Sequence, residues 1–292
     1  MGTTNVNRQN PVKNVEAKGK RAAKGAAYSP LMDRLARLGY AVKGLIYITI
    51  GLVAVQGVLG KSSTPADQLG AIRALGKLPY APFILWVILI GLISYSLWGL
   101  IRAILDPFHK GKDMQGLLAR GGYLVSAITY ASFVLPTYHL IIGTRRGAGP
   151  NQTLQFVIKL MAMPWGRVIV GALGVATIAA GLYQIYMGIT LNFEKQFKPY
   201  ALATEQLRVA KQIGRFGTVA RGVVFALVGY FFFLAAYYAR PGQAQGFDGA
   251  LRFLADQPYG LWLMGIIAAG LIAFGIYSLM SAAWFRLKDS QR

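Results

Sequence analysis

Six long apolar runs constrain the fold of this chain more than any other feature of its sequence. Each run is about twenty residues or longer, enough for a helix to cross the ~30 Å hydrocarbon core of a bilayer. Backbone groups in lipid must bond to one another, which favours helices, and the alternating polarity of membrane β-strands is missing from these runs. The sequence therefore predicts an all-α polytopic membrane helix bundle with six transmembrane helices. The runs cover residues 39–59, 82–105, 121–143, 165–190, 217–239 and 260–285.

The charge distribution also points to a lipid environment. Only 14% of the residues are charged, against about 25% in an ordinary soluble domain. The net charge is +21, and the basic residues lie before and between the apolar runs, where anionic lipid headgroups would meet them. We therefore expect membrane lipids as partners and no nucleic acid, since no soluble basic module with interleaved aromatic residues is available. The chain contains no cysteine, which excludes disulfides, thiolate metal sites and covalent haem.

A short phrase, Ala/Gly-Arg-x-Gly, precedes or opens every second apolar run and marks a threefold internal repeat. Its arginines are Arg37, Arg120 and Arg215. Each repeat holds two predicted membrane helices, and three such units allow a pseudo-threefold arrangement. The predicted divisions are a basic cytoplasmic tail at 1–30, repeat 1 at 31–106, repeat 2 at 107–193, and repeat 3 with a short C-terminal tail at 194–292.

The loop inside each repeat recurs as well, and predicts a short amphipathic helix at the outer membrane interface. Thr64 followed by Pro65 predicts the start of the first of these helices, because Thr caps helices and Pro favours the first helical position. Each loop ends in a proline followed by an aromatic residue, which is typical of the aromatic belt. The loops carry Arg73, Lys159 and Arg252, which we expect to bind lipid headgroups or a solute at this interface.

Basic residues are distributed unequally between the two sides of the predicted bundle. About twenty lie in the tail, the loops after the second and fourth runs and the C-terminus, and about nine lie in the opposite loops. The positive-inside rule therefore predicts that both termini are cytoplasmic. Lys43 and Arg221 lie about one turn inside their helices near the same side, and we expect them to extend their charges to the interface.

Small residues spaced four apart predict where the helices pack, because close backbone contact drives association in lipid. Pro136 lies inside the third run, where it frees the carbonyl group of Ser132 and predicts a kink. The small-residue stripes are Ala172, Ala176 and Ala180 in the fourth run, and Gly265, Ala269 and Ala273 in the sixth.

Two candidate sites follow from these patterns. Arg37, Arg120 and Arg215 would form an anion site if they faced a common axis, and would hold lipid headgroups if they faced outward. His139 is the one histidine inside a run, and a membrane histidine can bind haem or a pigment. Because no second haem ligand is visible, a hydrogen-bonded interfacial histidine is the alternative, and we expect no cofactor.

Several kinds of chemistry are missing from the sequence. None of the apolar runs contains Asp or Glu, whereas proton- or sodium-coupled transporters usually need a buried carboxylate. No Ser-His-Asp set, metal-binding cluster or phosphate-binding glycine loop occurs. We therefore do not expect an enzyme.

The three tandem two-helix units, each with its Ala/Gly-Arg-x-Gly phrase, resemble an uncharacterised bacterial integral membrane family that carries a triplicated domain of unknown function. The similarity covers nearly everything from Leu35 to Phe285. The resemblance implies the topology and a bacterial cytoplasmic (inner) membrane. It implies no substrate and no catalytic residue.

The small-residue stripes, the basic tail and the missing chemistry favour a non-enzymatic structural or accessory protein that packs against other membrane subunits. An alternative is a channel or carrier for an anionic solute, based on the three repeated arginines. A second alternative is pigment or haem binding through His139.

Overall fold

The computed structural model describes residues 30–61, 66–107, 111, 113–143, 152–190 and 204–284. These residues form helices and turns, without a strand among them, so the all-α prediction is confirmed. Six helical segments are long and apolar enough to cross a membrane, which confirms the polytopic helix bundle. They are α2 (Pro30–Val58), α4 (Ala81–Leu105), α5 (Met114–Ser132) with α6 (Val134–Ile141), α8 (Gly166–Thr190), α9 (Thr204–Tyr237) and α11 (Gly260–Trp284). The basic tail at 1–29 lies outside the described residues.

The third span is interrupted, as Pro136 predicts. Helix α5 ends at Ser132, Phe133 lies between the two helices, and α6 starts at Val134. Proline cannot donate the backbone hydrogen bond that would continue the helix past Ser132. The chain instead closes the break through Phe133, whose backbone N–H donates to the carbonyl oxygen of Tyr130 at 3.2 Å.

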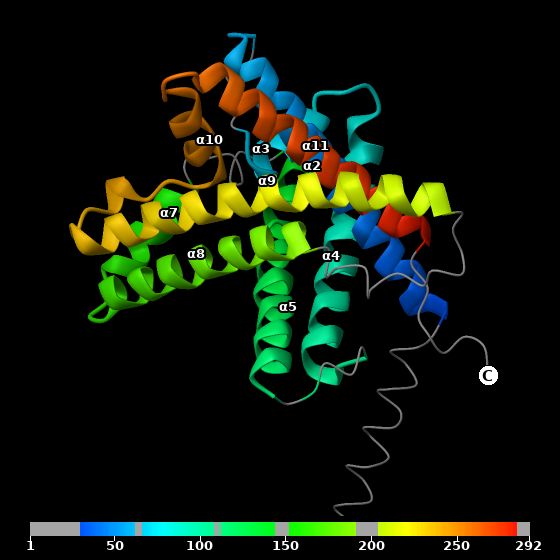
Figure 1. Cartoon of the computed structure of the whole chain (residues 1–292), viewed down its shortest axis with the longest axis horizontal. Coiled ribbons are helices and arrows are strands. Elements are labelled where there is room, and N and C mark those ends of the chain that lie inside the picture. Colours follow the sequence, from blue (N-terminus) through cyan, green and yellow to red (C-terminus); the bar gives the residue numbers. More distant parts are fainter. Residues whose placement is uncertain are drawn as a thin grey trace, which may run out of the picture.

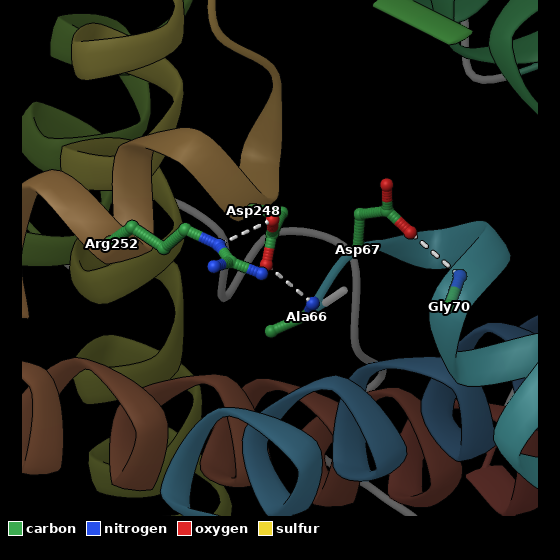
Figure 2. A network of polar contacts seen from close by, with 5 residues as sticks. All are labelled: Ala66, Asp67, Gly70, Asp248 and Arg252. Carbon is green, nitrogen blue, oxygen red and sulfur yellow. Dashed lines mark hydrogen bonds and ion pairs between the residues drawn. The ribbon is translucent and has the colours of Figure 1, made fainter. Parts of the chain in front are cut away.

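Each repeat contains a short helix between its two spans, as the loops predicted. These helices are α3 (Gln68–Leu75), α7 (Gln152–Met161) and α10 (Phe247–Ala255), with a 3₁₀ turn, η4 (Pro241–Gln243), before the last. The predicted start of the first one is wrong, because its N-cap is Asp67 rather than Thr64, which lies outside the described residues. The carboxylate of Asp67 accepts a 2.6 Å hydrogen bond from the backbone N–H of Gly70 (Figure 2). Such a bond satisfies one of the free N–H groups at a helix start.

The spans pair most extensively across repeats rather than within them. Helix α2 packs along α11, α5 along α4, and α9 along α8. The three pairs run in different directions in Figure 1: α8 and α9 across the view, α4 and α5 down it, and α2 and α11 diagonally. Each pair joins the first span of one repeat to the second span of the preceding repeat, with repeat 1 following repeat 3. This cyclic exchange of partners matches the expected pseudo-threefold arrangement.

Glycines bring the backbones of two of these pairs into contact. A Cβ atom placed on Gly222 of α9 would lie 2.8 Å from the carbonyl oxygen of Gly181 on α8, and one on Gly44 of α2 would lie 2.7 Å from the carbonyl oxygen of Gly275 on α11. No side chain could be added at either position without moving the neighbouring helix.

Most residues of the predicted small-residue stripes are exposed in the described part of the chain. Ala172, Ala176 and Ala180 are exposed on α8, as are Gly265 and Ala269 on α11, whereas Ala273 is partly buried. Spacing by four identifies a face of small residues but not the helix that packs against it. In α8 the contact with α9 uses the glycine face instead.

Contacts between the two spans of one repeat are present in repeats 1 and 3. Gly39 of α2 packs against Tyr95 of α4, and Gly217 of α9 packs against Phe274 of α11. In repeat 2 the equivalent residue is Gly122 of α5, and a Cβ atom there would meet nothing within 4 Å. Helices α5 and α8 make no comparable contact in the described part of the chain. We call this gap in the pseudo-threefold arrangement the open seam.

Candidate functional site

Three cationic side chains lie in the interior of the bundle. Lys43 of α2 is only 7% exposed and Arg102 of α4 only 6%, while Arg221 of α9 is partly buried. The prediction that Lys43 and Arg221 extend to the membrane interface is therefore wrong. Both residues instead contact inward-facing side chains, because the glycine contacts of α2 with α11 and of α9 with α8 fix the rotation of these helices.

The hydrogen-bond partners of the three cations are tyrosine hydroxyl groups. Lys43 Nζ donates to Tyr95 Oη at 3.1 Å. Arg102 Nη1 donates to Tyr40 Oη at 3.1 Å, and Arg221 Nε donates to Tyr47 Oη at 2.8 Å. None of these three partners is a carboxylate group.

Aromatic rings shared between the cations join them into one group. Lys43 Nζ lies 5.1 Å from the centroid of the Tyr95 ring and 5.0 Å from that of Phe274. The guanidinium carbon of Arg102 lies 5.7 Å from the same Tyr95 ring, and that of Arg221 lies 4.8 Å from the same Phe274 ring. These distances are typical of cation–π contacts. We call the group the cation–aromatic cluster, which consists of Tyr40, Lys43, Tyr47, Tyr95, Trp98, Arg102, Tyr123, Arg221, Phe225 and Phe274.

No carboxylate balances the charge of the cluster among the described residues. The ion pairs described, Arg37–Asp33 and Arg252–Asp248, involve other residues. In addition, Nε and Nη2 of Arg102 are buried and find no acceptor at hydrogen-bonding geometry in the described part of the chain. A buried charged donor left without an acceptor costs more than about 1–3 kcal/mol. The cluster is therefore electrostatically complementary to an anion.

The repeats contribute equivalent positions to this cluster. Lys43, Ser126 and Arg221 lie at the same distance after the arginine of the repeated phrase in copies one, two and three. Ser126 interacts through its side chain with the hydroxyl group of Tyr95, so all three positions reach the interior. A basic residue at the same place in two copies, each followed four residues later by an aromatic ring, was the sequence signal for this site. It was missed because a basic residue near a helix end was interpreted as an interfacial anchor.

The three arginines of the repeated phrase have separate environments. Arg37 Nε pairs with Asp33 Oδ2 at 3.1 Å on the same helix. Arg120 donates from Nε to the carbonyl oxygen of Ala103 at 2.8 Å and from Nη2 to that of Ile104 at 3.2 Å, which caps the end of α4. Arg215 is exposed on α9. These contacts do not gather the three guanidinium groups into one site, and headgroup binding by each of them stays a prediction.

The outer trio is also dispersed, over three surface helices. Arg73 is partly buried on α3, and Lys159 is exposed on α7. Arg252 on α10 pairs through Nε with Asp248 Oδ2 at 2.8 Å. The other oxygen of Asp248 accepts from the backbone N–H of Ala66 at 2.7 Å, so this carboxylate ties α10 to the segment before α3 (Figure 2). Lipid or solute binding by the trio stays a prediction.

His139 lies on α6, near the end of the interrupted span. Its ring is partly buried, and its centroid lies 6.2 Å from that of Tyr138. Among the described residues, no three His, Cys, Asp or Glu side chains come together as a metal site. Haem or pigment binding through His139 stays a prediction, as does the absence of a cofactor.

Comparison with known proteins agrees with the repeat pattern. The family model described as Domain of Unknown Function (DUF1206) matches residues 38–106, 121–190 and 216–284. The uncharacterized protein YxxB of Bacillus subtilis (strain 168) is 33% identical over 255 residues, which cover 87% of this chain and 92% of that protein. No solved structure matches the chain. With three tandem copies of the domain spread over six candidate membrane spans, the chain belongs to the uncharacterised DUF1206 family of triplicated membrane proteins.

Proposed function

We propose that this protein binds an anionic solute inside its membrane-spanning core and acts as a channel or carrier for it, without enzymatic chemistry. The observation that carries the proposal is the cation–aromatic cluster, with three inward-facing cations and no acidic residue in any apolar run. The proposal keeps the anion alternative from the sequence but moves the site from the repeated arginines to Lys43, Arg102 and Arg221.

The competing interpretation is that the tyrosines and rings satisfy the cations and the cluster is purely structural. A cation at the bilayer centre costs about 2.5–3.5 kcal/mol on insertion scales. A desolvated cation–π contact returns about 2 kcal/mol, so rings can offset much of the cost of one cation. They do not remove the repulsion among three like charges, which is strong where water is excluded. An anion held between the cations would replace this repulsion with attraction.

The depth of the cations favours a path over a single surface site. Arg102 lies in the last turn of α4. Its guanidinium carbon lies 5.7 Å from the centroid of the Tyr95 ring, and Lys43 Nζ lies 5.1 Å from the same centroid. An anion could therefore pass from the end of the bundle at Arg102 to Lys43 and Arg221 along neighbouring cations.

Removing individual charges tests this proposal. The protein in nanodiscs of neutral lipid would be heated with benzoate, inorganic phosphate or dodecanoate, and the shift of the melting temperature would be measured. We expect at least one of these anions to stabilise the protein, and Lys43→Met or Arg221→Met to weaken its apparent affinity at least tenfold. Lys77→Met, which removes an exposed charge in the turn after α3, is the control and should respond like the unmodified protein.

The same variants separate a binding site from a structural cluster. Without an anion, Lys43→Met should melt at the same or a higher temperature, because the change removes an unneutralised charge. A large loss of stability, or identical anion responses in all variants, would refute the proposal. Liposome flux of the anion that binds would then distinguish a conducting protein from a static binder.

For the orientation we propose the bacterial cytoplasmic membrane with both termini in the cytoplasm, as the basic residues indicate. Arg102 would then lie toward the cytoplasmic side. Labelling of single introduced cysteines with an impermeant reagent checks this directly, because the chain has no cysteine of its own.

An accessory role is the second candidate. The exposed stripe of Ala172, Ala176 and Ala180 on α8 favours it, because small residues let another membrane helix approach closely. Helix α8 also forms one side of the open seam, so a partner helix and a solute would compete for it.

A further inference from the structure

We infer that the anion is an amphiphile, with a carboxylate or phosphate headgroup on an acyl chain, which enters from the lipid phase through the open seam between α5 and α8. The inference rests on the proposed function, because it names the substrate class of the cation–aromatic cluster and the route to it.

Comparison of the three repeats locates the opening. In repeats 1 and 3 a large ring, Tyr95 or Phe274, packs on the glycine of the facing helix and closes the gap between the two spans. The equivalent position in α8, counted from the proline–aromatic pair that precedes each second span, is Ala180. Ala180 is exposed, and its counterpart Gly122 on α5 meets nothing within 4 Å. Repeat 2 therefore lacks the ring that closes the other two.

The α5 side of the seam leads directly to the cations. Tyr123, next to Gly122, is partly exposed, and its ring centroid lies 4.4 Å from the guanidinium carbon of Arg102. Ser126, one turn further along α5, is also partly exposed and interacts with Tyr95. A headgroup that passed Tyr123 would reach the buried Nε and Nη2 of Arg102, which have no acceptor in the described part of the chain.

Outside this polar strip, the two helices of the seam are strongly apolar. Their exposed side chains would surround an acyl chain while its headgroup reached inward. A small water-soluble anion would need no opening toward lipid. The cations inside the bundle favour an anionic group, and the exposed apolar side chains of α5 and α8 favour an acyl chain. Together they point to one molecule that carries both groups. The exposed apolar residues include Leu124, Val125 and Ile128 on α5, and Leu173, Val175 and Leu182 on α8.

A buried tryptophan in the cluster provides the readout. Trp98 is fully buried, and its ring lies 5.7 Å from the guanidinium carbon of Arg102. In a variant that keeps Trp98 alone, a stearate with a nitroxide label near its carboxylate should quench the fluorescence saturably in nanodiscs of neutral lipid. The methyl ester of the same probe, which lacks the charge, should quench at least tenfold less at equal concentration. The other tryptophans, Trp86, Trp165, Trp262 and Trp284, would be replaced by phenylalanine.

Closing the seam tests the route. Ala180→Phe supplies the missing ring and should weaken the apparent affinity for the labelled stearate at least fivefold. Ala179→Phe adds the same bulk to a neighbouring exposed position and is the matched control, which should leave quenching unchanged.

The outcomes separate the two proposals. Equal quenching by acid and ester would overturn the amphiphile inference, because it would show partition into lipid without charge recognition. Unchanged quenching in Ala180→Phe would overturn lateral entry, while the anion-binding function would stand if Lys43→Met still abolished the effect of anions on melting. If neither Lys43→Met nor Arg102→Met altered quenching or melting, both proposals would fall.

Discussion

At the scale of single residues, the side chains at equivalent repeat positions decide what the interior can hold. Lys43 and Arg221 place charges where the second copy has Ser126, so the pseudo-threefold interior has two cations and one hydroxyl group at this level. Arg102 adds a third cation from a position where the other copies have Met187 and Ser281. The repeat therefore determines where these side chains lie, and the differences between the copies determine which of them carry a charge or a hydroxyl group.

Asp67 shows how burial acts on a residue outside the spans. Burial raises the pKa of its carboxyl group, against the lowering effect of the hydrogen bond from the Gly70 N–H. A pKa that is higher in the folded than in the unfolded chain favours folding at low pH, and this contribution is lost as pH rises through the folded pKa. Asn caps helices as well as Asp but carries no charge. Asp67→Asn should therefore match the unmodified protein in melting temperature at pH 4 and exceed it at pH 7.

The control for Asp67 is the exposed carboxylate of Asp256 at the end of α10. Asp256→Asn should show no comparable gain between pH 4 and pH 7. If Asp67→Asn melted lower than the unmodified protein at pH 7, the charged carboxylate would be stabilising and burial would not dominate its environment.

At the scale of helices, apolar length predicted the spans, and Pro136 predicted the break between α5 and α6. The pairing of spans could not be predicted in the same way. Gly44 and Gly222 belong to the same repeated pattern, but the sequence does not say that they meet the second span of the preceding repeat. The stripe at Ala176 has the same small-residue spacing but is exposed. Spacing identifies a face that can pack closely, whereas only the fold identifies the partner.

Two glycines provide a matched test of helix contact. In Gly222→Ala the new Cβ atom would lie 2.8 Å from the Gly181 carbonyl oxygen and 3.0 Å from the backbone nitrogen of Ile185. Separating α8 from α9 to relieve this contact should cost about 1–3 kcal/mol. In Gly265→Ala on α11 the Cβ atom meets nothing within 4 Å, so the higher helix propensity of alanine should add up to about 1 kcal/mol. Melting temperatures that fell equally in both variants would show that the α8–α9 contact is not the cause.

At the scale of the whole molecule, the cyclic pairing of spans across repeats makes the open seam a property of the assembly rather than of one helix. In repeats 1 and 3 an aromatic ring of one span packs on a glycine of the other span, and in repeat 2 no ring packs on the equivalent glycine. The sequence could have suggested this, because Ala180 replaces the ring of Tyr95 and Phe274. The sequence does not show, however, that those rings pack against Gly39 and Gly217, which is a contact that only the fold reveals. The same asymmetry supports both lateral entry of a solute and the docking of a partner helix.

A change in the small stripe separates these two uses of the seam. Ala176→Leu fills the exposed stripe on α8, whereas Val175→Leu enlarges a neighbouring side chain that is already 54% exposed. If another membrane subunit packs on the stripe, cross-linking in mild detergent should capture a partner with the unmodified protein and with Val175→Leu. The same partner should be lost with Ala176→Leu, because close packing of helices in lipid depends on small side chains. A protein that ran alone in all three cases would remove the support for an accessory role. The face of α8 would then be left to lipid, which is the condition that lateral entry of an anionic amphiphile requires.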